Sequence, residues 1–143
     1  FLQNQKGSRI RNKYNEKTLE YIKEEELLAA AEYQYGFIPG TLGEDNDCLD
    51  VWLISKQDHE VGKIIECNVL GMLEMFEEYR EEREEDFKII VCPVNDGNLT
   101  PQTAVEEIKR FTLEIFKQFP EVKISFGNYL PPKQAEEFIL QKS

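Results

Sequence analysis

Hydrophobic positions along the chain gather in short runs rich in β-branched and aromatic residues, which is the pattern of buried strands. Gly71 interrupts one run at a place where a β-bulge is expected. Pro93 ends another run because it cannot donate to a central ladder. The polar segment Gln57–Gly62 predicts a turn between the first two runs. We therefore predict strands over Leu49–Ser55, Lys63–Met75, Phe87–Val94 and a shorter run, Val122–Phe126.

Two segments in the last third of the chain show the spacing of helices instead. The first runs from Pro101, which suits the first helical position, to Phe119, with Thr100 as its cap and Pro120 as its stop. A second, shorter helix is predicted over Pro132–Gln141. The residues expected to face inward are Ala104, Val105, Ile108, Phe111, Ile115 and Phe119 in the first helix, and Ala135, Phe138 and Ile139 in the second.

The segment Lys17–Glu32 is ambiguous. Its Glu, Lys, Leu and Ala content favours a helix by intrinsic propensity, whereas the family resemblance described below makes part of it strand. Taken together, several strands followed by helices predict an α+β domain, a sheet or barrel with helices on one side. The length of 143 residues suits a single domain over 1–143, and the start without Met leads us to expect that an upstream N-terminal segment is missing.

The composition is that of an ordinary water-soluble protein, with 41% hydrophobic and 31% charged residues. No run approaches the ~18 apolar residues of a membrane span, and the first residues lack the layout of a signal peptide, so we expect a cytoplasmic protein with no membrane partner. The net charge of -11 argues against nucleic acid as a partner. An acidic excess suits a metal site, but composition alone favours a solvated surface.

The three cysteines, Cys48, Cys67 and Cys92, have no C-x-x-C spacing and are odd in number, which argues against a disulfide framework and for a reducing compartment. Cys67 and Cys92 lie in apolar runs and are expected to be buried thiols, whereas Cys48 lies inside an acidic cluster. A single histidine, His59, lies in a polar segment and is expected in a surface loop. A His-rich zinc site and a serine triad therefore lose support.

The candidate chemistry is concentrated in a D-x-D-x-x-D motif formed by Asp45, Asp47 and Asp50 at the start of a predicted strand. Carboxylates this close repel one another, and either a divalent cation or plain solvent exposure must offset that cost. An EF-hand is a poor match, because Leu49 and Asp50 stand where an oxygen ligand and a glycine are needed. The spacing alone leaves metal binding and solvent exposure equally open.

The surrounding residues, Y-G-F-I-P-x-T-L-G-E-D-x-D-x-L-D-V from Tyr35 onward, closely resemble the signature region of soluble family I inorganic pyrophosphatases. The resemblance continues over most of the chain, in segments 69–75 and 86–93, in the Lys-Gly-Ser and Lys-Tyr pieces near the start, and in Phe116–Lys117. It implies a compact, OB-like β-barrel of antiparallel strands with flanking C-terminal helices. It also implies a homo-oligomer, since short pyrophosphatases commonly assemble as hexamers.

The activity implied by the resemblance is magnesium-dependent hydrolysis of inorganic diphosphate to two phosphates. In this family pattern Asp47 orients and deprotonates the attacking water. Mg²⁺ ions lower the pKa of that water, and cationic side chains neutralise charge on the leaving phosphate. The implied metal ligands are Asp45, Asp50, Asp86 and Glu77, and the implied substrate-binding residues are Lys13, Lys23, Tyr35, Lys88 and Lys117.

Several positions depart from the family pattern: Asn15 replaces a glutamate, Lys23 an arginine, Ala31 and Phe116 a tyrosine each, and Glu77 an aspartate. These departures leave an alternative open, a catalytically weakened or inactive homologue that serves as a binding or interaction protein. A weaker alternative is an acidic scaffold without a ligand. For the charged segment 77–86 we favour a solvated loop or short helix over the reading in which Glu77 and Asp86 both point into the metal site.

Overall fold

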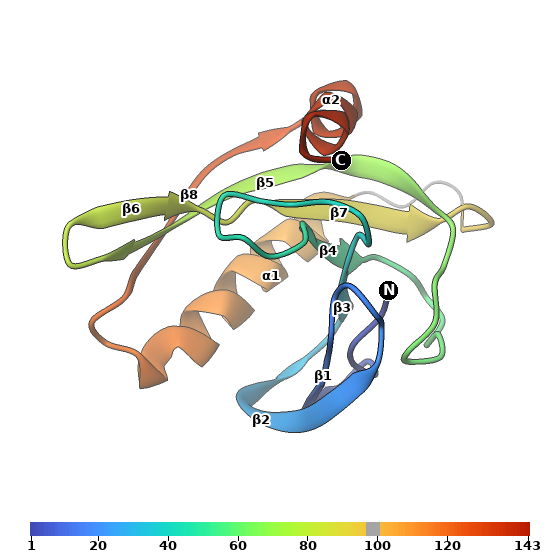
Figure 1. Ribbon diagram of the computed structural model, residues 1–143, viewed down its shortest axis with the longest axis horizontal. Helices are drawn as coiled ribbons and strands as arrows, with labels where there is room; N and C mark the ends of the chain where they lie inside the picture. Colours follow the sequence, from blue (N-terminus) through green and yellow to red (C-terminus); the bar gives the residue numbers. More distant parts are fainter. Residues whose placement is uncertain (97–100) are drawn as a thin grey trace.

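The computed structural model describes residues 1–96 and 101–143, and it is dominated by sheet (Figure 1). The described strands and helices are β1 (Ser8–Tyr14), β2 (Tyr21–Ala31), β3 (Gln34–Phe37), β4 (Asp50–Leu53), β5 (Cys67–Tyr79), β6 (Glu82–Glu85), β7 (Lys88–Pro93), α1 (Pro101–Ile115), the 3₁₀ turn η1 (Phe116–Gln118), β8 (Lys123–Leu130) and α2 (Pro132–Lys142). The α+β class is confirmed. No helix in the described residues is long and apolar enough to cross a membrane.

The main sheet has the strand order β3-β4-β7-β5-β6, with β8 paired to β5, and β1 and β2 form a separate hairpin. The ladders of the described strands leave the sheet open, so the OB-like barrel is not closed by hydrogen bonds. One pair also departs from the expected antiparallel arrangement. β7 lies between β4 and β5 and runs antiparallel to β5 but parallel to β4.

The ambiguous segment is a strand, so the helix favoured by propensity is wrong. β2 pairs with β1 in a register that sets Lys23 opposite Lys13. The turn between the strands is built by Asn15, whose Oδ1 accepts the backbone N–H groups of Lys17 and Thr18 at 2.9 and 3.0 Å. Pairing with β1 and this side-chain turn supply the backbone with partners in the strand conformation, so tertiary context overrides helix propensity.

The charged segment 77–86 is neither a loop nor a helix, which makes the favoured interpretation wrong. It forms the β5–β6 hairpin, in which Glu77 lies opposite Glu84. Arg80 and Glu81 turn the chain with φ values of 52° and 69°, the left-handed conformation that a two-residue hairpin turn requires. The bulge prediction at Gly71 is confirmed by a register shift beside it, and a Cβ there would overlap the Tyr129 hydroxyl.

The two helices cover opposite faces of the sheet, whereas one face was expected (Figure 1). Alternation along the strands gives the reason. Leu73 and Ile90 face a cluster with α1, and their neighbours Met72 and Ile89 face a cluster with Ala135 of α2. Phe138 and Ile139 pack against the second cluster, as predicted.

The predicted face of the first helix is right as far as Ile115, which is half-buried and lines a cavity, and wrong for Phe119. Ala104, Val105 and Ile108 are buried in the α1 cluster and Phe111 packs against it. The α-helix then ends at Ile115 and tightens into η1, so Phe119 is 45% exposed. The predicted cap, Thr100, lies outside the described residues.

Cysteine and histidine expectations are largely confirmed. Cys48, Cys67 and Cys92 are free thiols, with Cys92 buried and Cys67 half-buried. His59 lies in the loop between β4 and β5 but is partly buried. Its Nε2 lies 3.1 Å from the hydroxyl of the buried residue Ser55.

We predict that Ile90→Ala lowers the free energy of unfolding by about 3 kcal/mol, because Ile90 is 0% exposed and the shortened side chain leaves a cavity between β7 and α1. The matched control is Ile64→Ala, whose side chain is 66% exposed and whose loss costs less than about 0.5 kcal/mol. Urea unfolding followed by circular dichroism measures the free energy of unfolding of both variants. Equal losses of this free energy would contradict the burial of Ile90 in the core.

Candidate functional site

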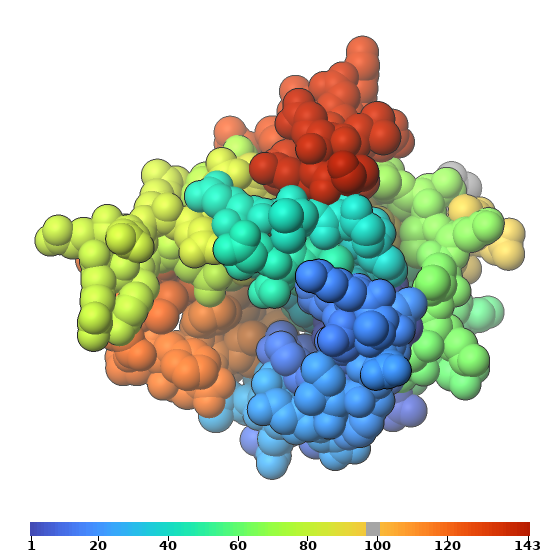
Figure 2. Space-filling model, in the orientation of Figure 1, coloured from blue at the N-terminus to red at the C-terminus, as the bar shows by residue number. Residues whose placement is uncertain are grey.

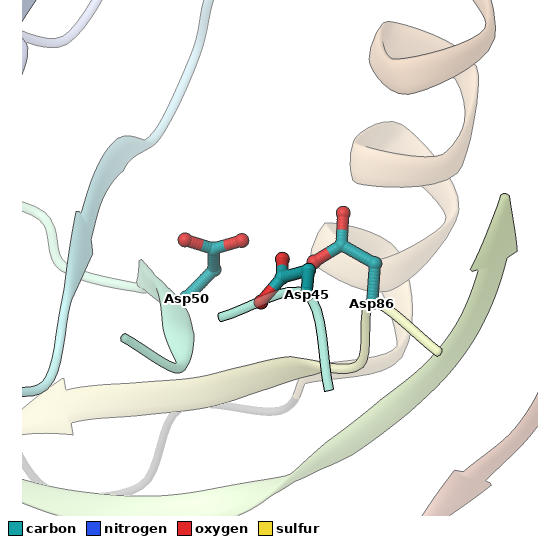
Figure 3. Close-up of side chains that lie close together, drawn as sticks. All are labelled: Asp45, Asp50 and Asp86. Carbon is teal, nitrogen blue, oxygen red and sulfur yellow. The ribbon is translucent and has the colours of Figure 1, made fainter. Parts of the chain in front are cut away.

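Three carboxylates from separate segments meet at one end of the sheet (Figure 3). Asp45 comes from the loop before β4, Asp50 opens β4, and Asp86 precedes β7. Each offers one oxygen atom, and these atoms lie within 4.8 Å of one another. The parallel β4–β7 pair explains the meeting, because its register sets Asp50 opposite Lys88 and so brings Asp86 to the same end. Carboxylate oxygens in this number are the ligands of hard divalent cations.

Hydrogen bonds between side chains and backbone groups of the same loop hold the segment that carries Asp45 and Asp47. The Thr41 hydroxyl donates to the carbonyl of Ile38 at 2.6 Å and accepts the N–H of Leu49 at 2.9 Å. The backbone N–H of Asp47 donates to Oδ1 of Asp45 at 3.1 Å. These bonds fix the direction in which both carboxylates leave the loop.

Lys88 lies inside the carboxylate cluster and is only 6% exposed. Its Nζ donates to Asp50 Oδ2 at 2.6 Å, to Asp86 Oδ2 at 2.9 Å and to the hydroxyl of Tyr35 at 3.1 Å. Burial alone would lower the pKa of Lys88, but the two carboxylates outweigh burial and hold that pKa well above its ordinary value. All three donors of the ammonium are therefore used within the protein.

The pKa values of the neighbouring carboxyls show where positive charge is lacking. Burial, with contributions from Asp86 and Asp50, raises the pKa of Asp45 to about 6 despite the hydrogen bond from Asp47. Burial and the adjacent Asp86 raise the pKa of Glu77 to about 7. Burial also works against ionisation of Asp86, but Lys88 outweighs it and the pKa of Asp86 is lowered. A cation bound here would relieve the two raised groups.

These side chains line a cavity of about 230 Å³. Of the residues predicted to form the site, the structure brings eight to its wall: Asp45, Asp47, Asp50, Glu77, Asp86, Lys13, Tyr35 and Lys88. Lys23 and Lys117 lie outside the wall. Lys23 is exposed on β2, and Lys117 is 69% exposed in η1, where it pairs with Glu114 at 2.8 Å.

The cavity wall also contains two charged residues that the sequence interpretation missed, Arg11 and Glu16. Arg11 precedes Lys13 by two residues on β1, so the alternation of a strand places both side chains on one face and could have revealed it. Its guanidinium pairs with Glu25 at 3.0 Å and lies 5.7 Å from the ring centre of Tyr35.

Glu16, one residue after Asn15, brings a carboxylate to the cavity wall. Its Oε1 accepts the backbone N–H of Cys48 at 2.7 Å, which ties the β1–β2 hairpin to the acidic loop. Asn15 itself builds the hairpin turn described above.

Comparisons with known proteins place the chain among inorganic pyrophosphatases. A family model described as inorganic pyrophosphatase matches residues 4–140. Soluble inorganic pyrophosphatase 3 of Arabidopsis thaliana is 30% identical over 94% of this chain and 64% of its own length. An inorganic pyrophosphatase of Sulfolobus acidocaldarius is 32% identical over 82% of this chain and 70% of its own length. This chain thus spans slightly less than two thirds of the plant relative.

Solved structures give the same fold. The inorganic pyrophosphatase of Thermus thermophilus superposes with a TM-score of 0.82 at 26% identity, covering 97% of this chain and 84% of that one. The inorganic pyrophosphatase of Neisseria gonorrhoeae has a TM-score of 0.83 at 23% identity and covers 99% of this chain and 86% of that one.

We predict that Asp45→Asn makes the protein more stable than wild type in a chelator at pH 8. The difference in the free energy of unfolding between the two proteins grows as pH rises from 3.8 to about 6. The pKa of Asp45 is raised from 3.8 to about 6, so the folded state binds its proton more tightly, and this stabilisation is lost between those values. Asparagine stays neutral and avoids the loss. Urea unfolding from pH 4 to 8 measures the difference, and a gap that does not change with pH would contradict the assignment.

Proposed function

Because the chain belongs to the inorganic pyrophosphatase family, we propose that it hydrolyses inorganic diphosphate to two phosphates with magnesium ions held by its acidic cluster. The observation that carries this proposal is the convergence of the carboxylates of Asp45, Asp50 and Asp86 on one point of the cavity that also contains Asp47 and Lys13. Five acidic side chains from the predicted set share this wall with basic ones, as cleavage of a phosphoric anhydride requires.

The proposed metal ligands are Asp45, Asp50 and Asp86, with Glu77 beside Asp86. The donor set fits Mg²⁺, which prefers carboxylate oxygens. Bound there, Mg²⁺ would lower the pKa of a water and neutralise phosphate charge. The raised pKa values of Asp45 and Glu77 support the proposal, because burial and the neighbouring Asp86 disfavour their ionised forms and a bound cation would favour them.

Asp47 is the proposed general base. It is exposed to the cavity, whereas the ligand carboxylates are partly buried, and its backbone is fixed by the bond to Asp45. It takes the proton of the water that attacks one phosphorus. The new P–O bond forms as the bridging P–O bond breaks, and the leaving phosphate keeps the electron pair.

The cations proposed to hold the substrate are Lys13 and Arg11. Both line the cavity from β1, and no salt bridge joins Lys13 to another residue in the described part of the chain. Lys88 and Tyr35 are proposed to act mainly by holding Asp50 and Asp86 in place, since the Lys88 donors are used there. Lys23 and Lys117, implied by the resemblance, would have to move to reach a substrate in this cavity.

We extend the proposal to the setting of the reaction. Three free thiols and a net charge of -11 support a cytoplasmic enzyme that acts on a small anion without nucleic-acid or membrane partners. The two core clusters lie on the two faces of one sheet, which supports a single domain over 1–143. A homo-oligomer remains part of the proposal from the family resemblance alone.

We predict that Asp47→Asn lowers phosphate release from diphosphate in magnesium by about 10²–10³-fold, because the amide cannot accept the proton of water. Asp58→Asn is the control, since Asp58 is exposed and outside the cavity. Full turnover in Asp47→Asn would remove this residue from the mechanism. A wild-type protein that binds magnesium but releases no phosphate would favour the alternative of an inactive binding homologue.

We also predict that Lys13→Met lowers kcat/KM for diphosphate by about 10–100-fold, the effect of one lost charged hydrogen bond. Lys117→Met should change it less than about twofold, because Lys117 is paired with Glu114 outside the cavity. Steady-state kinetics of the two matched variants shows whether Lys117 binds the substrate, as the family resemblance implies, or lies outside the site, as in the structure. A large loss in Lys117→Met would restore the family assignment of that lysine.

A further inference from the structure

A groove with apolar and charged lining residues adjoins the candidate active cavity. It has a volume of about 460 Å³ and is lined by Arg11, Glu25, Glu26, Leu27, Ile115, Phe116, Gln118 and Phe119. Four of these residues, Arg11, Leu27, Ile115 and Phe116, also line the active cavity, so the two spaces adjoin. Figure 2 shows the hollow between the orange segment of α1 and the blue β1–β2 hairpin.

The helix side of the active cavity offers almost nothing to a phosphate, whereas Arg11 lies on the hairpin side. The helix side presents Phe111, Ile115 and Phe116, and the one polar group there, the Thr112 hydroxyl, already donates to the carbonyl of Ile108 at 2.8 Å. An inorganic anion gains no binding from such a surface. An apolar group attached to the phosphate would gain binding, because the contact removes apolar area from water.

The groove selects an uncharged occupant. Its formal charges are already paired within the hairpin: Arg11 with Glu25 at 3.0 Å, and Glu26 with Arg9 at 3.5 Å. A longer inorganic polyphosphate would therefore find no cation in the groove lining that lacks a carboxylate partner. The rings of Phe116 and Phe119 lie 6.2 Å apart at 61°, an edge arrangement that favours a flat ring as a third member.

We propose that the chain also hydrolyses organic diphosphate monoesters whose neutral arm ends in an aromatic ring. The inference rests on the proposed function, since both substrates use the same carboxylates. Water attacks the terminal phosphorus at the acidic cluster, the P–O–P bridge breaks, and the organic monophosphate leaves with the electron pair. The products are orthophosphate, which carries the oxygen of water, and the organic monophosphate, whose arm lies along Leu27 and Phe116 towards Phe119.

The test compares 2-phenylethyl diphosphate with ethyl diphosphate, which has the same charge and lacks the ring. We expect kcat/KM to be about tenfold higher for the phenylethyl ester, the scale of one apolar group in a pocket. Phe119→Ala should abolish this preference and leave hydrolysis of inorganic diphosphate unchanged, because Phe119 lines the groove and not the active cavity. Leu113→Ala is the matched control, an exposed apolar residue on α1 outside both spaces. In H₂¹⁸O the label should appear in orthophosphate only.

Three outcomes separate this inference from the proposed function. Equal kcat/KM for the two esters, or a preference that survives in Phe119→Ala, overturns the groove assignment while diphosphate turnover keeps the proposed function intact. Label in the organic monophosphate overturns the proposed orientation. If no substrate is hydrolysed, the proposed function fails. Calorimetric binding of the two esters in magnesium then tests the groove assignment by itself. Tighter binding of the phenylethyl ester, lost in Phe119→Ala, supports the groove, and equal binding overturns it.

Discussion

The buried ammonium of Lys88 between Asp50 and Asp86 is the interaction on which the rest of the site depends. Removing this much water from a charge is costly, and the cost is met only because two carboxylates and a hydroxyl receive all three donors. The same bonds join the start of β4 to the start of β7, the one parallel pair of the described sheet. Breaking a buried pair of this kind by removing one partner costs about 3–5 kcal/mol.

The single positive charge of Lys88 cannot balance the negative charge of the whole carboxylate cluster. Asp45 and Glu77 add negative charge close to Asp86, and neither has a salt bridge in the described part of the chain. Burial, with a further contribution from the neighbouring carboxylates, raises the pKa values of both groups and makes the site receptive to a divalent cation. The fold therefore stores at this point an electrostatic cost that ligand binding relieves, which is the usual way a functional site departs from maximum stability.

The cavity has two chemically different sides, and separate elements build them. The sheet and the acidic loop supply carboxylates, and β1 adds Arg11 and Lys13. The end of α1 supplies apolar side chains on the opposite wall, together with Thr112, whose hydroxyl is already bonded within the helix. The bond from Cys48 to Glu16 holds the hairpin against the acidic loop, so the distance between the two sides depends on a contact between segments remote in sequence.

The sequence by itself determined the strands with strong apolar runs, both helices and the carboxylates of the D-x-D-x-x-D motif, because these signals are local. Periodicity shows which residues share a face, and the motif places three acids within six positions. Only the tertiary structure decided that Lys17–Glu32 contains a strand, that Lys117 turns away from the cavity, and that Arg11 and Glu16 enter it. The strand depends on pairing of β2 with β1, and the position of Glu16 depends on its bond to Cys48, whereas Lys117 is held by a local pair with Glu114 at the tightened helix end. The contact between Glu16 and Cys48 is non-local and leaves no periodic trace along the chain, so the order of the residues could not have supplied it. Arg11 differs, because strand alternation from Lys13 could have revealed it once β1 was recognised.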